Sequence, residues 1–232
     1  MERTRIETVY SEYEKSESYK KIHSPLGISS YYQHALKKHL LFLFREMGLT
    51  SLSGLKILDI GIGKGSNIPD FYKFGIDAKH LYGLDILVER LKYLRRLYTD
   101  LYLINSDAVQ APIKSKSFDL VFQFVVFSSI LDNSVCKAVS SEMLRVLKDD
   151  GIIVWYDSYG GKKMSEHTRS YSEKDIKNFF PECSMEFKRI IPHSQLSFRL
   201  AKYEHGWLAL DIIENIFPFL NCMQLCVIRK KL

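Results

Sequence analysis

Short apolar runs alternate with amphipathic stretches through the middle of the chain. Apolar runs of the kind that form buried strands occupy residues 55–60, 81–85, 101–104, 117–124 and 152–157. Between some of these runs, apolar residues recur at helical spacing, as at 88–98 and 135–147. Strands that alternate with helices favour a parallel sheet covered on both faces, because crossover connections are right-handed. With two further strands expected at 185–191 and 220–229, the pattern predicts a Rossmann-like, doubly wound α/β fold with a mostly parallel seven-stranded sheet.

The segment before this core is more polar. Residues 3–21 are rich in charge and tyrosine, which favours a helical arm, and residues 24–27 are typical of a turn. Ser29 or Ser30 is then expected to cap a long amphipathic helix that ends near Gly48.

Several details outside the central strands are also predicted. His34 and His39 are expected on the surface of the first long helix. Lys148–Gly151 is expected to form a tight turn before the fifth strand, because a glycine follows two aspartates. Ser172 suits the cap of a later helix, and residues 203–217 are expected to form a single helix.

Three glycines at alternate positions follow the first apolar run. Asp59 lies inside the end of that strand, and Gly61, Gly63 and Gly65 come next. Glycine lets the backbone approach a ligand and adopt positive φ, while the start of the next helix favours a negative group. A dinucleotide fingerprint would need glycine at Ser66, and a Walker A loop would need a hydroxyl residue directly after the lysine. The motif therefore indicates a different nucleotide-like ligand, and an ordinary glycine-rich turn is the alternative.

Acidic residues follow the next two strands. Asp85 lies 20 residues beyond Gly65, the distance at which a βαβ unit places a carboxylate beside a ribose. Its two oxygens can accept both ribose hydroxyls. Asp107, just past the third strand, can accept a hydrogen bond from an adenine amine. The alternatives are a helix-capping Asp85 and a turn-forming Asp107.

Composition narrows the class of protein only slightly. The 232 residues can bury a full core, and 46% hydrophobic with 26% charged residues is ordinary for a globular protein. The net charge of +6 permits an acidic substrate, but the basic residues are scattered, which favours a solvated basic surface. The four cysteines form no zinc-ligand spacing, so no metal is expected. A charged start and the lack of a long apolar run predict a reduced, cytoplasmic protein without a membrane span.

The order of these motifs resembles that of class I S-adenosylmethionine (SAM)-dependent methyltransferases of the small-molecule type. The resemblance rests on Ile57–Gly65, Asp85, Asp107 before Ala111–Pro112, Phe118–Val121 and Glu142–Gly151. Lys64 departs from the family pattern, in which a small residue is usual at that position. A looser resemblance leads to a bacterial subgroup associated with glycan biosynthesis, through Val126–Asp132, Trp155–Asp157, Arg169 and Val227–Lys230.

The resemblance implies a set of SAM-binding residues and a division of the chain. The cofactor-binding set would be Asp59, Gly61, Ile62, Gly63, Gly65, Asp85, Ile86, Asp107, Ala108, Gln123 and Phe124. Residues 1–232 would form one domain, with a helical arm or lid at 1–50, a SAM-binding core at 53–157 and an acceptor-side region at 158–232.

The methyl acceptor is expected over the fourth and fifth strands, because their carboxyl ends open into the same crevice. Candidate acceptor-binding residues are Ser128, Arg169, Tyr10 and Tyr13. Arg169 would suit an acidic or phosphate-bearing acceptor, and the alternative is that it pairs with a carboxylate of its own chain.

A hydroxyl acceptor also needs its proton removed, and Asp157 and His167 are the candidates for this role. The alternatives are that Asp157 caps the following loop and that His167 is a surface residue.

The function that follows is transfer of a methyl group from SAM to a small molecule, such as a sugar or glycan hydroxyl, with S-adenosylhomocysteine as product. An NAD(P)-dependent Rossmann oxidoreductase and a non-catalytic SAM-binding protein are the alternatives. A nucleic acid substrate is disfavoured, because Gln123–Val126 is unlike the Pro-Pro-aromatic motif of enzymes that methylate base amines. The sequence names neither the acceptor nor the oligomeric state.

Overall fold

The structure, a computed structural model, describes residues 2–22 and 28–231. The turn expected at 24–27 lies outside these residues. Apart from the first two positions, the chain forms two compact units: Arg3–Thr50 with Lys188–Gln224, here the first unit, and Ser51–Phe187 with Leu225–Leu232, here the second unit. Each unit is described by itself, and the single domain expected from the sequence stays a prediction.

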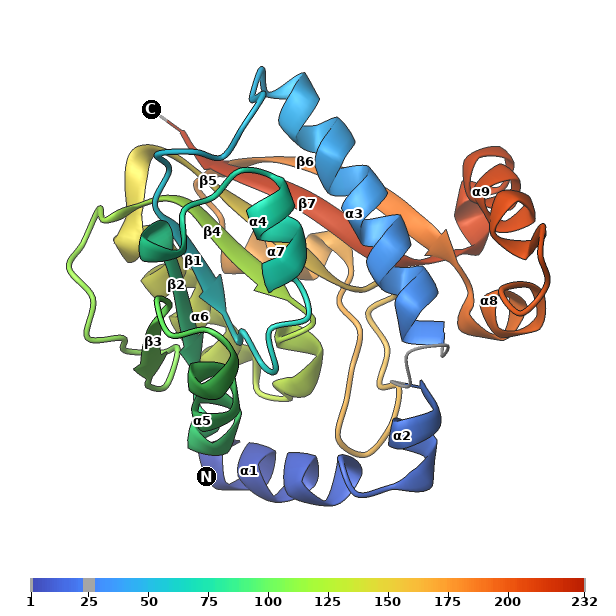
Figure 1. Cartoon of the computed structure of the whole chain (residues 1–232), viewed down its shortest axis with the longest axis horizontal. Helices are drawn as coiled ribbons and strands as arrows, with labels where there is room; N and C mark the ends of the chain where they lie inside the picture. Colours follow the sequence, from blue (N-terminus) through green and yellow to red (C-terminus); the bar gives the residue numbers. More distant parts are fainter. Residues whose placement is uncertain (1, 23–27, 232) are drawn as a thin grey trace. The chain divides into compact units, whose positions relative to one another are not determined.

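Seven strands form one sheet in the order β3-β2-β1-β4-β5-β7-β6 (Figure 1). Their bounds are β1 Ile57–Ile60, β2 Leu81–Asp85, β3 Tyr102–Asn105, β4 Phe118–Phe124, β5 Leu147–Ser158, β6 Cys183–Pro192 and β7 Asn221–Lys230. β1 pairs in parallel with both β2 and β4, β2 with β3, and β4 with β5. The predicted doubly wound sheet is confirmed, and its strand order reverses between β1 and β4, where such sheets bind ligands.

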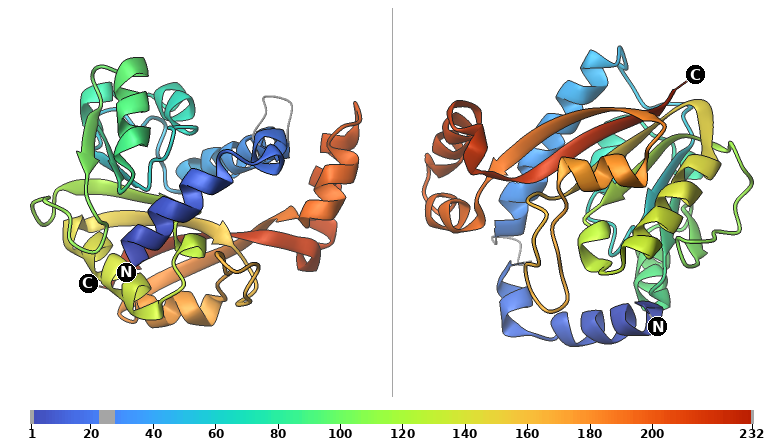
Figure 2. Two further views of the ribbon diagram at one scale, coloured as in Figure 1. Left: turned by 90° about the horizontal axis from the view of Figure 1, so that it is seen from below. Right: turned by 180° about the vertical axis from the view of Figure 1, so that it is seen from behind.

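Helices cover both faces of the sheet in the second unit. α4 (Ile68–Lys73) and α5 (Val88–Leu97) lie on one face, and α6 (Asn133–Val146) and α7 (Glu173–Phe179) lie on the other (Figure 2). Two short 3-10 turns lie in this unit: η1 (Ala78–His80) follows α4, and η2 (Phe127–Ser129) follows β4. The core joins buried side chains of the sheet to α6 and α7, with Trp155, Phe127 and Tyr171 as its largest members.

The first unit is mainly helical. Its helices are α1 (Glu2–Tyr13), α2 (Glu17–Ile22), α3 (Ile28–Glu46), α8 (Ser194–Leu200) and α9 (Gly206–Ile216), with a 3-10 turn η3 (Pro218–Leu220). The helical structure predicted for residues 3–21 is confirmed by α1 and α2, and the role of this segment as an arm or lid stays a prediction. Among the described residues, no helix has both the length and the apolar character to cross a membrane.

His39 contradicts the expectation of a surface residue, whereas His34 is exposed as expected. The His39 ring lies 2.7 Å from Oε1 of the buried Glu214, and Lys38 lies 3.2 Å from the same oxygen. Burial alone would raise the pKa of Glu214, but its hydrogen bond and charge interaction with His39 lower it to about 2. The pair joins α3 to α9 across 175 positions of sequence, which no local pattern reveals.

The starts of two helices and one turn also differ from the expectations. α3 begins at Ile28, before both predicted caps. The helix expected at 203–217 is α9, which begins three residues later, at Gly206, close against the Leu200 carbonyl at the end of α8. Lys148–Gly151 is not a turn but the start of β5, held by the ion pairs Lys148–Asp119 (2.6 Å) and Lys116–Asp149 (2.7 Å). The Ser172 cap of α7 is confirmed.

Candidate functional site

The glycine loop after β1 has the backbone that its glycines permit. Gly61, Gly63 and Gly65 have φ angles of +71°, +58° and +74°, values that other residues adopt at a cost. A Cβ at Gly61 would lie 2.3 Å from Cγ2 of Val126, and one at Gly65 would lie 2.4 Å from Cδ1 of Ile68. These two glycines are therefore needed for packing inside the protein.

Gly63 differs from the other two glycines of the loop. A Cβ there would meet nothing closer than 3.8 Å, namely the Arg90 guanidinium and the Gly61 carbonyl. The space beside the loop is thus open at its middle glycine. A ligand could approach the backbone at this point.

Asp85 joins the end of β2 to the glycine loop. The Gly63 N–H donates to Oδ2 of Asp85 at 2.9 Å, and the Leu87 N–H donates to Oδ1 at 2.8 Å. The carboxylate is buried, and the Arg90 guanidinium lies 4.0 Å from it. A carboxylate offers about four acceptor sites, more than two amides take. Asp85 therefore caps the following turn and can also accept hydroxyl donors from a ribose.

Asp59 is buried on β1 and lies close enough to Asp85 to interact with it electrostatically. Burial, and secondly the charge of Asp85, raise the pKa of Asp59 to about 8. Two carboxyl groups in one buried place resist ionising together. Such a shift is common where a protein binds a ligand, although structural pairs also produce it.

Asn105 and Arg90 belong to this region but were not found from the sequence. The Asn105 side-chain amide donates to the Asp85 and Ile86 carbonyls, both at 3.0 Å, and so fixes the chain where it leaves β2. The register Asp85↔Asn105 between β2 and β3 could have indicated Asn105. The position of Arg90 in the first turn of α5 could have indicated this residue, but less clearly.

The carboxyl end of β3 carries the predicted adenine-binding pair. Oδ1 of Asp107 accepts a hydrogen bond of 3.0 Å from the Val109 N–H, which is the turn-forming role left open above. Asp107 and Ala108 are both partly exposed, as is Ile86 at the end of β2. The sheet thus brings the glycine loop, Asp85 and Asp107 to one edge, as its parallel strands require.

Comparison with known proteins indicates the family of the domain that carries this edge of the sheet. Residues 58–155 match the family model of a methyltransferase domain. This stretch, less than half of the chain, forms a methyltransferase domain. Within the described residues, no cluster of His, Cys, Asp or Glu is suited to hold a metal ion.

The relatives of this chain are distant. An uncharacterized protein of Methanocaldococcus jannaschii is 25% identical over 77% of this chain and 71% of its own length. A sterol 24-C-methyltransferase of Gibberella zeae is 28% identical over 55% of this chain, which spans only 33% of that enzyme. A SAM-dependent methyltransferase of Archaeoglobus fulgidus has a similar structure, with a TM-score of 0.58, 17% identity, and coverage of 84% of this chain and 94% of its own. At that identity the structural likeness shows the fold alone.

The backbone at the carboxyl end of β4 is strained. Val125, a β-branched residue, has φ of +58° and is 42% exposed, so packing does not explain its conformation. Its N–H donates to the Tyr156 carbonyl at 2.8 Å. The neighbouring Phe124 is partly buried, and Val126 packs against Gly61. The strained Val125 thus connects the end of β4 to Val126, the residue that packs against the glycine loop.

Asp157 organises the turn beyond β4. Its Oδ2 accepts hydrogen bonds from the Ser128 N–H (3.0 Å) and the Gln123 amide (3.1 Å), and its Oδ1 accepts one from the Ser158 N–H (2.8 Å). Burial raises the pKa of Asp157 to about 6, although these hydrogen bonds favour the charged form. The carboxylate is fully buried, an environment that fits the loop-capping alternative better than a base in contact with a substrate.

Gln123 is also fully buried. Its side-chain oxygen accepts no hydrogen bond from the part of the chain that the structure describes. The role expected for its backbone carbonyl, as acceptor of the SAM ammonium, stays a prediction.

The loop after β5 folds back as a hairpin between Lys162 and Ser170. The Ser170 N–H donates to the Lys162 carbonyl at 2.8 Å, and the Met164 N–H donates to the Thr168 carbonyl at 2.9 Å. The exposed His167 is held at the tip, where its N–H donates to Oγ of Ser165 at 3.1 Å. This hairpin belongs to the same compact unit as the glycine loop.

Arg169 fixes the hairpin to the turn beyond β4. Its N–H donates to the Ser128 carbonyl at 3.0 Å, and its guanidinium donates to Oδ1 of Asn133 at 3.0 Å. The guanidinium also lies 4.6 Å from the centre of the Tyr171 ring. Among the described residues, the guanidinium of Arg169 therefore contacts an amide and an aromatic ring rather than the carboxylate of the alternative.

Tyr10 and Tyr13 lie on α1, in the first unit. The Tyr13 ring packs edge-on against Tyr19 of α2 at 4.9 Å. Their contact with a cofactor or acceptor stays a prediction.

Proposed function

We propose that this chain binds SAM at the carboxyl ends of β1, β2 and β3 and transfers its methyl group to a small molecule. The observation that carries the proposal is the bond from the Gly63 N–H to Asp85, beside a glycine position with open space. Asp85 would accept the ribose hydroxyls, Asp107 would accept the adenine amine, and the glycine loop would contact the methionine end.

The sulfonium of SAM already makes the methyl group electrophilic, so the cofactor supplies the difficult chemistry. The protein's task is to hold the acceptor in line with the methyl carbon, and such positioning can contribute about 7–11 kcal/mol. The turn beyond β4, fixed by Asp157 through Ser128, would form the wall against which the acceptor is held. We assign Asp157 this positioning role.

The acceptor proposed is a hydroxyl compound that carries an acidic or phosphate group, such as a sugar derivative. The hairpin supplies Lys162, Lys163 and Arg169 against a single acid, Glu166. Arg169 presents a planar fork suited to carboxylate or phosphate, and its contacts to Asn133 and Tyr171 orient that fork. His167, at the exposed tip, is the proposed proton acceptor for the hydroxyl.

The test is transfer of an isotope-labelled methyl group from SAM to paired acceptors that differ only in a phosphate group, followed by mass spectrometry. We expect label in the phosphorylated member of a pair and S-adenosylhomocysteine as the second product. Reduction of NAD(P) by the protein, without methyl transfer, would support the oxidoreductase alternative instead.

A further inference from the structure

The outward face of α9 is apolar. Leu208, Ile212 and Ile216 stand four residues apart and so share one face of the helix. Their side chains are 62%, 50% and 62% exposed. The opposite face is used within the first unit, where Leu210 and Glu214 are buried. The described residues cover no more than about half of this aliphatic ridge.

Large exposed side chains extend the ridge onto the neighbouring segments. α8 lies beside α9, and η3 follows it in the chain (Figure 1). With the ridge, the residues that we call the α9 surface are Phe198, Tyr203, Trp207, Leu208, Ile212, Ile216, Phe217, Phe219 and Leu220.

The size of the α9 surface exceeds what a monomer usually exposes. Aromatic side chains have areas of about 150–250 Å². With areas of this order for all nine residues, their exposed fractions add up to roughly 800 Å². The largest apolar patch of a typical monomer is about 300–600 Å². A standard stable interface buries about 800 Å² on each partner. The α9 surface is therefore as large as one half of such an interface.

The orientation of α9 is fixed rather than accidental. The Trp207 indole donates to the Ala201 carbonyl at 3.1 Å, and its ring lies 4.9 Å from the His34 ring of α3. Lys38 of α3 binds Asp211 at 2.8 Å. These contacts, together with the buried Glu214, hold the apolar ridge outward.

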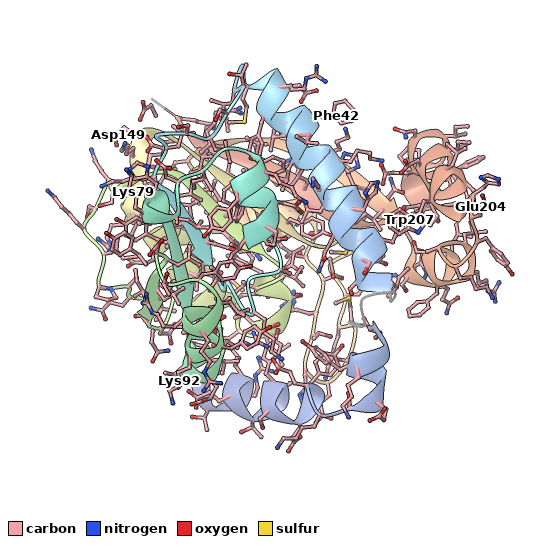
Figure 3. The ribbon with its side chains drawn as sticks, viewed as in Figure 1. Phe42, Lys79, Lys92, Asp149, Glu204 and Trp207 are labelled. Carbon is pink, nitrogen blue, oxygen red and sulfur yellow. The ribbon has the colours of Figure 1, made fainter. Side chains whose placement is uncertain are left out.

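Charges around the α9 surface indicate the kind of partner. Exposed Arg199 and Lys202 shortly precede the exposed Glu204, which Figure 3 labels on the segment that leads into α9. Helices that lie on lipid surfaces carry many Lys and Arg on their polar face. α9 itself carries two acids and neither Lys nor Arg. Both signs of charge at the edge favour a protein partner that also carries both.

We infer that the α9 surface is the interface of a twofold homodimer of this chain. In such an interface the same patch meets itself, so it must be complementary to itself. An aliphatic ridge can pack against its own copy, and Glu204 of one copy can pair with Arg199 or Lys202 of the other. The aliphatic ridge and the mixed charges allow the surface to be complementary to itself, and its area is large enough for a stable interface. The inference does not depend on the proposed cofactor or reaction.

The test is the mass of the purified protein in solution, by sedimentation equilibrium up to about 100 μM, a range that detects even weak dimers. We expect a dimer for the wild type. Ile212→Glu should raise the dissociation constant at least about 30-fold, as for a central interface residue. Leu97→Glu is the matched control: Leu97 is 55% exposed on α5, and its substitution should leave the dimer intact.

Charge exchange tests whether the partner is a second copy. Glu204→Arg should weaken the dimer through repulsion, and adding Arg199→Glu and Lys202→Glu should restore it. A monomeric wild type, or an Ile212→Glu variant that dimerises as well as the wild type, would overturn the inference. So would a monomer that floats with phosphatidylglycerol vesicles in an Ile212-dependent way, since the surface would then bind lipid.

Discussion

The Gly63 backbone amide donates a hydrogen bond of 2.9 Å to Oδ2 of Asp85, which links the glycine loop of β1 to the end of β2. One carboxylate therefore shapes the loop and faces the space proposed for the ribose. The same arrangement makes cofactor affinity and local stability depend on a single side chain. The two effects can be separated by substitution.

Asp85→Ala should weaken binding of S-adenosylhomocysteine, because the ribose hydroxyls lose their acceptor. A loss of about 1–3 kcal/mol is expected, or roughly 5- to 150-fold in the dissociation constant. The variant should also melt at a lower temperature without cofactor, since the Gly63 and Leu87 amides lose their partner. Isothermal titration calorimetry and thermal unfolding measure the two effects. A folded variant with unchanged affinity would show that Asp85 only caps the turn.

Gly61→Ala should destabilise the fold by about 2–4 kcal/mol, through strain at positive φ and overlap with Val126. Gly54→Ala is the matched control, because Gly54 has φ of +79° and nothing within 4 Å of its added Cβ. It should lose only the strain energy, about 1–2 kcal/mol. Val126→Ala in the Gly61→Ala background should recover part of the loss. Equal losses for the two glycine variants in urea unfolding would contradict the close packing of the loop.

Asp59→Asn should change how stability depends on pH. Burial raises the pKa of Asp59 from 3.8 to about 8, so between these values the folded protein retains a proton that the unfolded chain has released. The free energy of unfolding contributed by Asp59 therefore falls as pH rises through this range. As pH rises from about 5 to about 8, the free energy of unfolding of the neutral variant should increase relative to that of the wild type, as measured by urea unfolding. Asp77→Asn, with a side chain 57% exposed, should show no such gain. A constant difference between Asp59→Asn and the wild type would refute the shift.

Arg169→Ala and His167→Ala should leave SAM affinity within about twofold of the wild type, since both residues are placed on the acceptor side. Turnover of an anionic acceptor should fall by at least about tenfold for Arg169→Ala, because a charge-assisted hydrogen bond is lost. Arg169→Lys keeps the charge but not the fork and should recover only part of the activity. Loss of SAM binding in a folded Arg169→Ala protein would place Arg169 in the cofactor site instead.

The sequence predicted correctly that the glycine loop and Asp85 meet at one edge of the sheet, because the elements that carry them are local. Asp59, the three glycines and Asp85 follow from short spacings within one βαβ unit, and parallel pairing carries them to one edge. Asn105 required knowledge of the register of β3 against β2. The turn expected at Lys148–Gly151 is instead part of a strand, held by ion pairs with Asp119 and Lys116, which are distant in sequence.

Long-range contacts explain the remaining differences. His39 is buried because Glu214, on a helix far along the chain, accepts its hydrogen bond. The start of α9 at Gly206 lies close against the Leu200 carbonyl, a contact that a helical pattern does not reveal. The strain at Val125 likewise appears only in the folded backbone.

The central claim is that the edge formed by Gly63, Asp85 and Asp107 binds SAM. Calorimetric titration of the purified wild-type protein with S-adenosylhomocysteine, and separately with NADH, tests it most directly. The account predicts saturable binding of S-adenosylhomocysteine that Asp85→Ala weakens, and no binding of NADH. Binding of NADH without binding of either SAM or S-adenosylhomocysteine would contradict it.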